Sequence, residues 1–125
     1  MLIFAHMSQN FQPGDFLIFQ IESGYGLLRV LAIDERPEGT VWHLAAYSDL
    51  FLDVGMADTA LDSDTPLNIS HNHLALTNRA FESTQVARMR NVPLTDDELE
   101  ALNKWKQNED REVSDRSVRL LLGLR

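Results

Sequence analysis

The sequence predicts an α+β domain: a small antiparallel, SH3-like barrel or bent sheet with a C-terminal helix packed on it. Two observations lead to this prediction. Residues 13–92 contain five or six short apolar stretches separated by turn-forming residues, and residues 93–125 have a helical pattern. Residues 1–12 are predicted to be an N-terminal tail. The rest of the 125-residue chain, 13–125, is long enough for one domain with a single hydrophobic core.

A predicted β-hairpin opens the β-rich part. Pro13-Gly14-Asp15 is a turn-forming sequence, and it leads into a strand over 16–22. The stretch 23–26, Ser-Gly-Tyr-Gly, is interpreted as the tight turn before a second strand over 27–34. Because the beginning of the first strand is apolar on both faces, we expect both faces of that strand to be covered.

A third strand is predicted over 40–47, after a turn at 36–39. Period-2 alternation places Trp42, Leu44 and Ala46 on one face of this strand. The stretch 48–65 is acidic and is predicted to be a loop. Weaker strand signals follow at 67–70, 73–77 and 85–89.

The clearest local signal begins a helix. Thr95 and Glu98 have the spacing of a capping box, and Leu94 and Leu99 have the spacing of a hydrophobic staple. This helix is predicted to run to about residue 108. A second short helix is predicted within 114–122.

Composition narrows the classes of function. The net charge of −8 disfavours binding to nucleic acid or to an anionic membrane, and it suits a basic protein partner. The absence of cysteine excludes disulfides and thiolate sites. No apolar run reaches the length of a membrane-spanning helix, and no signal-peptide pattern is present, so we expect a cytoplasmic protein.

The residues predicted to bind a partner are aromatic and acidic side chains near the first turn and after the third strand. Tyr25 and Tyr47 are expected at the surface or its rim, whereas Trp42 is expected in the core. Exposed aromatic side chains beside carboxylates are typical of protein-binding faces. The predicted set is Tyr25, Tyr47, Asp49, Phe51 and Asp53.

Two alternatives to protein binding remain open at this point. His71 and His73 would share one face of a strand and could ligate a metal, with His43 or an aspartate of 49–64 as a third ligand. The protein would then bind a metal or be a metal-dependent enzyme. The other alternative is a small-ligand sensor with its pocket between the helix and the sheet. No catalytic motif is present, so we expect a non-enzymatic protein without a cofactor.

The first hairpin also carries a resemblance to a known family. The stretch 12–34 contains a Pro-Gly-Asp turn, an apolar strand, Gly-Tyr-Gly and an apolar strand through Val30-Leu31. In these features it resembles the immunity protein 26 group, bacterial proteins that neutralise toxins delivered between competing cells. The resemblance implies a cytoplasmic, non-catalytic inhibitor that binds a cognate toxin. The acidic charge agrees with this expectation, since many toxin nucleases present basic faces.

Overall fold

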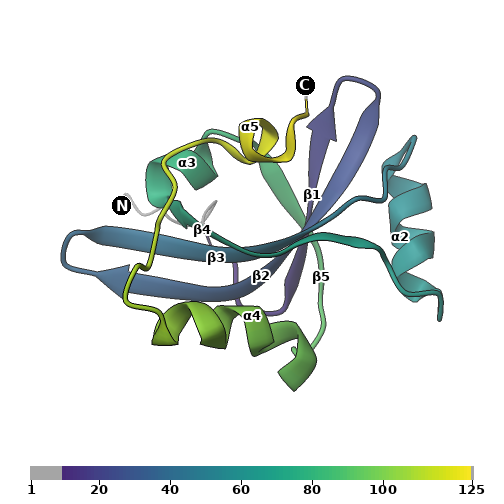
Figure 1. Ribbon diagram of the computed structural model, residues 1–125. Coiled ribbons are helices and arrows are strands. Elements are labelled where there is room, and N and C mark those ends of the chain that lie inside the picture. Colours follow the sequence, from purple (N-terminus) through teal and green to yellow (C-terminus); the bar gives the residue numbers. More distant parts are fainter. Residues whose placement is uncertain (1–9, 125) are drawn as a thin grey trace, which may run out of the picture.

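The computed structural model describes residues 10–124 (Figure 1). Their five strands form one antiparallel sheet in the order β4-β3-β2-β1-β5. The predicted α+β class is confirmed, and the sheet is not closed into a barrel, because β4 and β5 are its edges. The strands are β1 (Asp15–Ile21), β2 (Gly24–Arg36), β3 (Gly39–Tyr47), β4 (Ile69–Thr77) and β5 (Val86–Asn91). The helices are α2 (Val54–Asp62), α3 (Asn78–Glu82), α4 (Asp96–Gln107) and α5 (Val118–Leu122).

The turn of the β1–β2 hairpin begins one residue earlier in the chain than predicted. The turn is formed by Glu22 and Ser23, and Gly24 already pairs with Ile21 as part of β2. Glycine is needed at position 24 because a Cβ there would lie 2.3 Å from the carbonyl oxygen of Phe51. The predicted turn over 23–26 is therefore right only for Ser23, since Gly24, Tyr25 and Gly26 belong to β2. Gly24 permits the close approach of the chain that follows β3.

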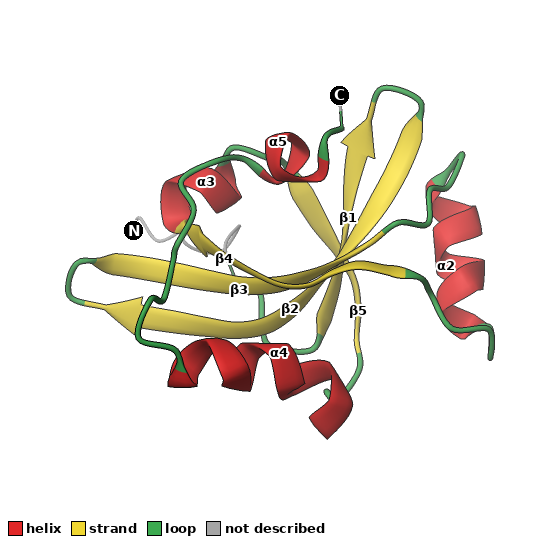
Figure 2. Ribbon diagram, viewed as in Figure 1, coloured by secondary structure: helices red, strands yellow, loops and turns green. Residues whose placement is uncertain are grey.

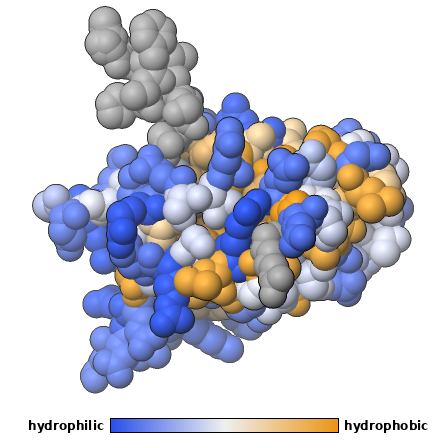
Figure 3. Space-filling model, turned by 90° about the horizontal axis from the view of Figure 1, so that it is seen from above, coloured by the Kyte–Doolittle hydropathy of each residue, from blue (hydrophilic) through white to orange (hydrophobic). Residues whose placement is uncertain are grey.

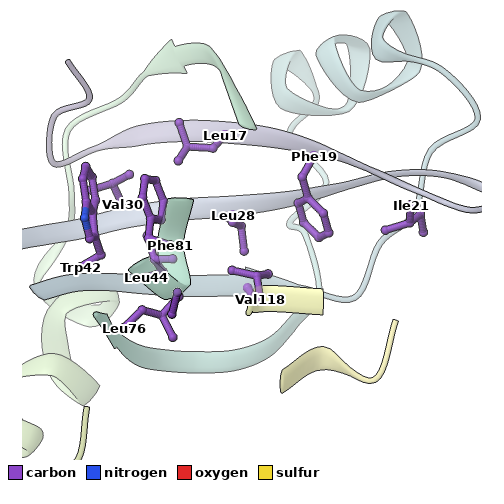
Figure 4. Packing of buried hydrophobic residues seen from close by; sticks show 12 residues of the cluster. Leu17, Phe19, Ile21, Leu28, Val30, Trp42, Leu44, Leu76, Phe81 and Val118 are labelled. Carbon is purple, nitrogen blue, oxygen red and sulfur yellow. The ribbon is translucent and has the colours of Figure 1, made fainter. Parts of the chain in front are cut away.

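One face of the sheet holds the larger hydrophobic core, which α3 and α5 cover (Figures 1 and 4). The Trp42 and Phe81 rings stack with their centroids 3.9 Å apart. Val118 of α5 is fully buried in this core, so the C-terminal segment is part of the fold. The core residues are Leu17, Phe19, Ile21, Leu28, Val30, Trp42, Leu44, Ala46, Leu76, Ala80, Phe81 and Val118.

The opposite face of the sheet is covered by α2 and α4 (Figure 2). Phe16 and Ile18 of β1 pack in one cluster with Ala57 of α2. Leu31 of β2 packs in another with Leu102 of α4. The expectation that both faces of the first strand are covered is therefore confirmed.

The chain between β3 and β5 differs most from the prediction. The stretch 48–65 contains the helix α2, which begins at the N-cap Asp53. His71 and Asn72 continue β4 as one strand, where two strands separated by a polar turn were predicted. Pairing with β3 stabilises an extended backbone there, although the local composition favours a turn.

The helix predicted from Thr95 is confirmed, including the capping box between Thr95 and Glu98. The second helix is shorter than predicted, because Ser114 pairs with β4 instead of joining it. Its amide donates to Ala75 O over 2.8 Å, and its carbonyl accepts from the Thr77 amide over 2.9 Å. A strap of chain, residues 109–117, thus runs from α4 across the β4 edge to α5 (Figure 1).

Residues 1–9 of the predicted N-terminal tail lie outside the described residues. Phe11, at its other end, packs edge-on against Trp42 and Phe81, with ring centroids 6.3 and 6.0 Å away. The packing of the domain therefore extends at least to Phe11.

Candidate functional site

Two of the predicted partner-binding residues meet where the chain leaves the sheet. The Tyr25 amide donates to Phe51 O over 2.8 Å, and the Phe51 amide donates to Tyr25 O over 2.9 Å. Both side chains are half-buried against the cluster beneath α2. This short bridge holds the segment 48–53 against the first hairpin.

The two predicted aspartates have local structural roles. Asp49 accepts hydrogen bonds from the backbone and side-chain amides of Asn68, at 2.6 and 3.1 Å. Asp53 caps α2 by accepting from the Met56 amide over 2.8 Å. Their carboxylates therefore stabilise the loop and the helix start while remaining at the surface.

Tyr47 does not lie at the surface. Its side chain is 8% exposed and packs against Phe16, so the expectation of an exposed or rim position is wrong. Burial raises the pKa of Tyr47 to about 12. Trp42, expected in the core, is 3% exposed, and that expectation is confirmed.

Exposed apolar side chains gather around the predicted residues. Leu50 and Leu52 precede α2, and Val54 and Met56 begin it; these four residues form what we term the apolar patch. Their exposed fractions are 53%, 76%, 44% and 48%, respectively. Figure 3 shows apolar surface at the right-hand end of the molecule, where α2 lies.

The surroundings of the apolar patch are acidic. Residues 48–65 contain five aspartates and no lysine or arginine. Arg90 of β5 reaches Asp58 and Asp62 and holds α2 against the sheet. Because Arg90 pairs with only two of these five aspartates, the segment 48–65 keeps a negative charge.

A buried arginine ties three segments together beneath α4. Arg29 is 2% exposed, and its guanidinium donates to both carboxylate oxygens of Glu98 at 3.2 Å. It also donates to Gly14 O at 2.7 Å and to Pro93 O at 3.4 Å, and it lies 4.1 Å from the centre of the Phe16 ring. Each of the three guanidinium nitrogens thus donates to at least one acceptor, as a buried charge requires.

A second polar cluster crosses three neighbouring strands. His43 of β3 is fully buried, and its Nε2 lies 3.1 Å from Asp34 Oδ2 of β2. Its Nδ1 lies 2.9 Å from His73 Nε2 of β4. Trp105 of α4 packs against both imidazoles, with ring centroids 4.8 and 5.5 Å away. We term Asp34, His43 and His73 the histidine chain.

The environment keeps both imidazoles neutral at pH 7. Burial lowers the pKa of His43, although Asp34 opposes this effect. Burial, and secondly the charge of His43, lower the pKa of His73 to about 4. Burial works to raise the pKa of Asp34, but hydrogen bonds from His43 and Arg36 outweigh it and hold that pKa below its usual value.

The two histidines considered as metal ligands have different hydrogen-bond partners. His73 uses Nε2 for its bond to His43, whereas His71 Nδ1 lies 3.2 Å from Ser70 Oγ. Across residues 10–124, no three side chains of the His, Asp or Glu type come together as a metal-binding group.

A groove opens beside His73, between α4, β4 and the strap 109–117. It encloses about 610 Å³, and its floor and walls are partly apolar. Trp105 Nε1 donates to Glu112 O over 3.0 Å and so holds the strap against α4. The groove is lined by His73, Leu74, Ala75, Trp105, Glu112, Val113, Ser114, Arg116 and Leu121.

Comparisons with known proteins give no assignment. No family model, no curated protein and no solved structure matches this chain. Among the described residues, no helix combines the length and the apolar character needed to span a membrane.

Sequence reasoning missed Arg29 and Asp34, and it named His43 and His73 together only as candidate metal ligands. Arg29 stands in an apolar strand, on the face that Leu27 and Leu31 share, and a charge in such a place indicates a buried partner. His43 gives the same signal between Trp42 and Leu44. Their partners Glu98 and His73 are distant in sequence, and no local pattern identifies them.

Proposed function

We propose that this protein is a non-enzymatic binding domain whose site is the apolar patch and its acidic surroundings, and that its partner is a protein with a basic, partly apolar face. The observation that carries the proposal is the exposure of Leu50, Leu52, Val54 and Met56 in one continuous segment. Monomeric proteins rarely leave such side chains together at the surface unless they meet a partner.

The geometry of the predicted residues supports this site. Phe51 and Tyr25 exchange two backbone hydrogen bonds and pack against the core, so Leu50 and Leu52 lie on an ordered backbone. A pre-ordered segment loses less conformational entropy on binding than a free loop does. The surplus of aspartates over arginine in residues 48–65 adds the charge that steers a basic partner.

The role that follows is an immunity-like one, in which the domain binds a cognate toxin and blocks it. The resemblance of 12–34 to the immunity protein 26 group supports this role, as does the net charge of −8. We also propose that the bent sheet is of the SH3-like type, as the sequence predicted.

The test places a photoreactive amino acid at position 52, and at position 120 as a matched control. Leu120 is 64% exposed and lies on α5, outside the four residues of the apolar patch. Cross-linking in cells of the source organism identifies the partner, which is then purified and titrated with wild-type protein, Leu52→Asp and Leu120→Asp. We expect Leu52→Asp to weaken binding at least about tenfold, a loss of ~1.4 kcal/mol, and Leu120→Asp to leave it unchanged.

A toxicity assay tests the immunity role. Expression of the partner alone should arrest growth, and co-expression of the wild-type protein, but not of Leu52→Asp, should restore it. If no protein cross-links at position 52, or if both aspartate variants bind equally well, the proposed site is wrong. A partner that is harmless when expressed alone contradicts the immunity role only.

A further inference from the structure

The histidine chain has only one consistent arrangement of protons at neutral pH. The ionised Asp34 carboxylate can only accept, so His43 must carry its proton on Nε2. A neutral His43 then has a lone pair on Nδ1 and accepts from His73. His73 must therefore carry its proton on Nε2, which leaves a lone pair on its Nδ1.

The lone pair on Nδ1 of His73 is not used by the described residues. It has no hydrogen-bond partner among residues 10–124, where His73 bonds only through Nε2. In that part of the chain, the one buried side-chain polar atom without a partner is Thr84 Oγ1. His73 Nδ1 also lacks a partner there and does not belong to this class, so it is not fully buried, and His73 itself lines the groove.

Two opposite charges line the same groove. The carboxylate of Glu112 and the guanidinium of Arg116 form no ion pair or hydrogen bond within the described residues; only their backbone atoms do, with Trp105 and Ser114. Beside them lie the Trp105 ring and the apolar side chain of Leu121. A single groove thus offers a cation, an anion, an imidazole acceptor and an apolar wall.

We propose that this groove binds a free amino acid with an apolar side chain. Its carboxylate pairs with Arg116, its ammonium donates to His73 Nδ1 and to Glu112, and its side chain packs against Trp105 and Leu121. The volume of this open groove, about 610 Å³, leaves room for a ligand of this size. Asp34 and His43 act as positioning residues, because their hydrogen bonds keep the lone pair of His73 on Nδ1.

This site is separate from the apolar patch. The groove lies between α4 and the strap, whereas the patch lies at α2, at the other end of the molecule (Figure 1). Amino-acid binding and protein binding are therefore tested independently of each other.

The first experiment reads the tautomer by ¹⁵N NMR of the imidazole nitrogens in the labelled, full-length protein at neutral pH. We expect His73 to show a protonated Nε2 and an unprotonated Nδ1. The reverse assignment would overturn the proposal, because Nδ1 would then repel an ammonium N–H.

The second experiment titrates L-phenylalanine while the His73 Nδ1 resonance is followed. Two analogues serve as matched probes: N-acetyl-L-phenylalanine lacks the ammonium, and L-phenylalaninamide lacks the carboxylate. We expect a saturable shift with L-phenylalanine and at least about tenfold weaker binding of each analogue. L-leucine and L-methionine are tested in the same way, since the wall is apolar but does not select one shape.

Surface variants then assign the contacts. Glu112 and Arg116 are exposed, so Glu112→Gln and Arg116→Gln should fold normally and weaken L-phenylalanine binding. His71→Ala, outside the histidine chain, should bind as the wild type does. The proposal fails if none of the three amino acids gives a saturable shift, if the analogues bind as tightly as L-phenylalanine, or if both glutamine variants leave binding unchanged.

Discussion

Two buried polar clusters connect single residues of the sheet to the helix α4. Arg29 pairs with Glu98, and His43 lies against Trp105. In each cluster a polar side chain from a central strand meets a residue of α4. The helix is therefore positioned by specific polar and aromatic contacts as well as by the apolar contact of Leu102.

Removal of the Arg29 guanidinium should be costly. We expect Arg29→Met to lower the free energy of unfolding by about 3 kcal/mol, because it leaves Gly14 O and the Glu98 carboxylate without their charged donor. Urea denaturation measures the loss. The double variant with Glu98→Gln should lose less than the sum of the two single changes.

The matched control applies the same change at an exposed ion pair. Arg79 is 81% exposed and pairs with Asp115, so Arg79→Met should cost less than about 1 kcal/mol. Equal losses at the two arginines would show that burial of Arg29 contributes nothing to the strength of its contacts.

At the scale of elements, short polar caps determine where the helices begin. Asp53, Thr77, Thr95 and Ser117 each accept a hydrogen bond from an amide in the first turn of a helix. Such caps act locally, over three residues, which is why the start of α4 could be predicted. Asp53 gives the same signal for α2, but the acidic composition of 48–65 favoured a loop.

Loss of one cap should have a modest and local effect. We expect Thr95→Ala to lower the free energy of unfolding by about 1 kcal/mol, because the Glu98 amide loses its acceptor. Thermal and urea unfolding measure this loss. Thr65→Ala, at an exposed position outside the helices, serves as the control and should change stability little. An unchanged stability of Thr95→Ala would contradict a role for the cap in holding α4.

The C-terminal strap is the element with the longest reach. It leaves α4, pairs with β4 through Ser114, and leads into α5, whose Val118 lies in the core. The Arg119 guanidinium then donates to Gln20 O of the first hairpin. Segments about 100 residues apart in sequence are thereby joined, and the groove beside His73 exists only because the strap crosses there.

At the scale of the whole molecule, the histidine chain makes stability depend on pH. The folded-state pKa of His73, about 4, is below its unfolded value of 6.5. Between these values the unfolded chain binds more protons than the folded one, so stability falls as pH falls through this window. Above pH 6.5 this contribution is fully present.

We expect a loss of about 2 kcal/mol across that window, after allowance for the partial exposure of His73. Urea unfolding at a series of pH values measures it. His73→Gln keeps an N–H donor for His43 but removes one titrating ring, so its stability should fall less steeply with pH. His71→Ala is the control and should follow the wild-type curve. Identical curves for wild type and His73→Gln would contradict the low pKa of His73.

The sequence by itself determined the features whose causes lie within a few residues. Period-2 alternation placed Trp42 and Leu44 on the core face, and the capping spacing of Thr95 and Glu98 placed the start of α4. The α+β class follows from the same local patterns. Of the residues predicted to bind a partner, Asp49, Phe51 and Asp53 lie in one surface segment because they are close in the chain, whereas Tyr25 joins them only through its backbone hydrogen bonds with Phe51.

Only the tertiary structure decided what depends on strand pairing and helix docking. The composition around His71 favours a turn, but pairing with β3 makes this stretch part of the continuous strand β4. Packing against Phe16 buries Tyr47. The partners of Arg29 and His43 lie 69 and 30 residues away along the chain. Such contacts form because a buried polar group must find a partner wherever the fold brings one, and no local pattern in the sequence specifies where that is.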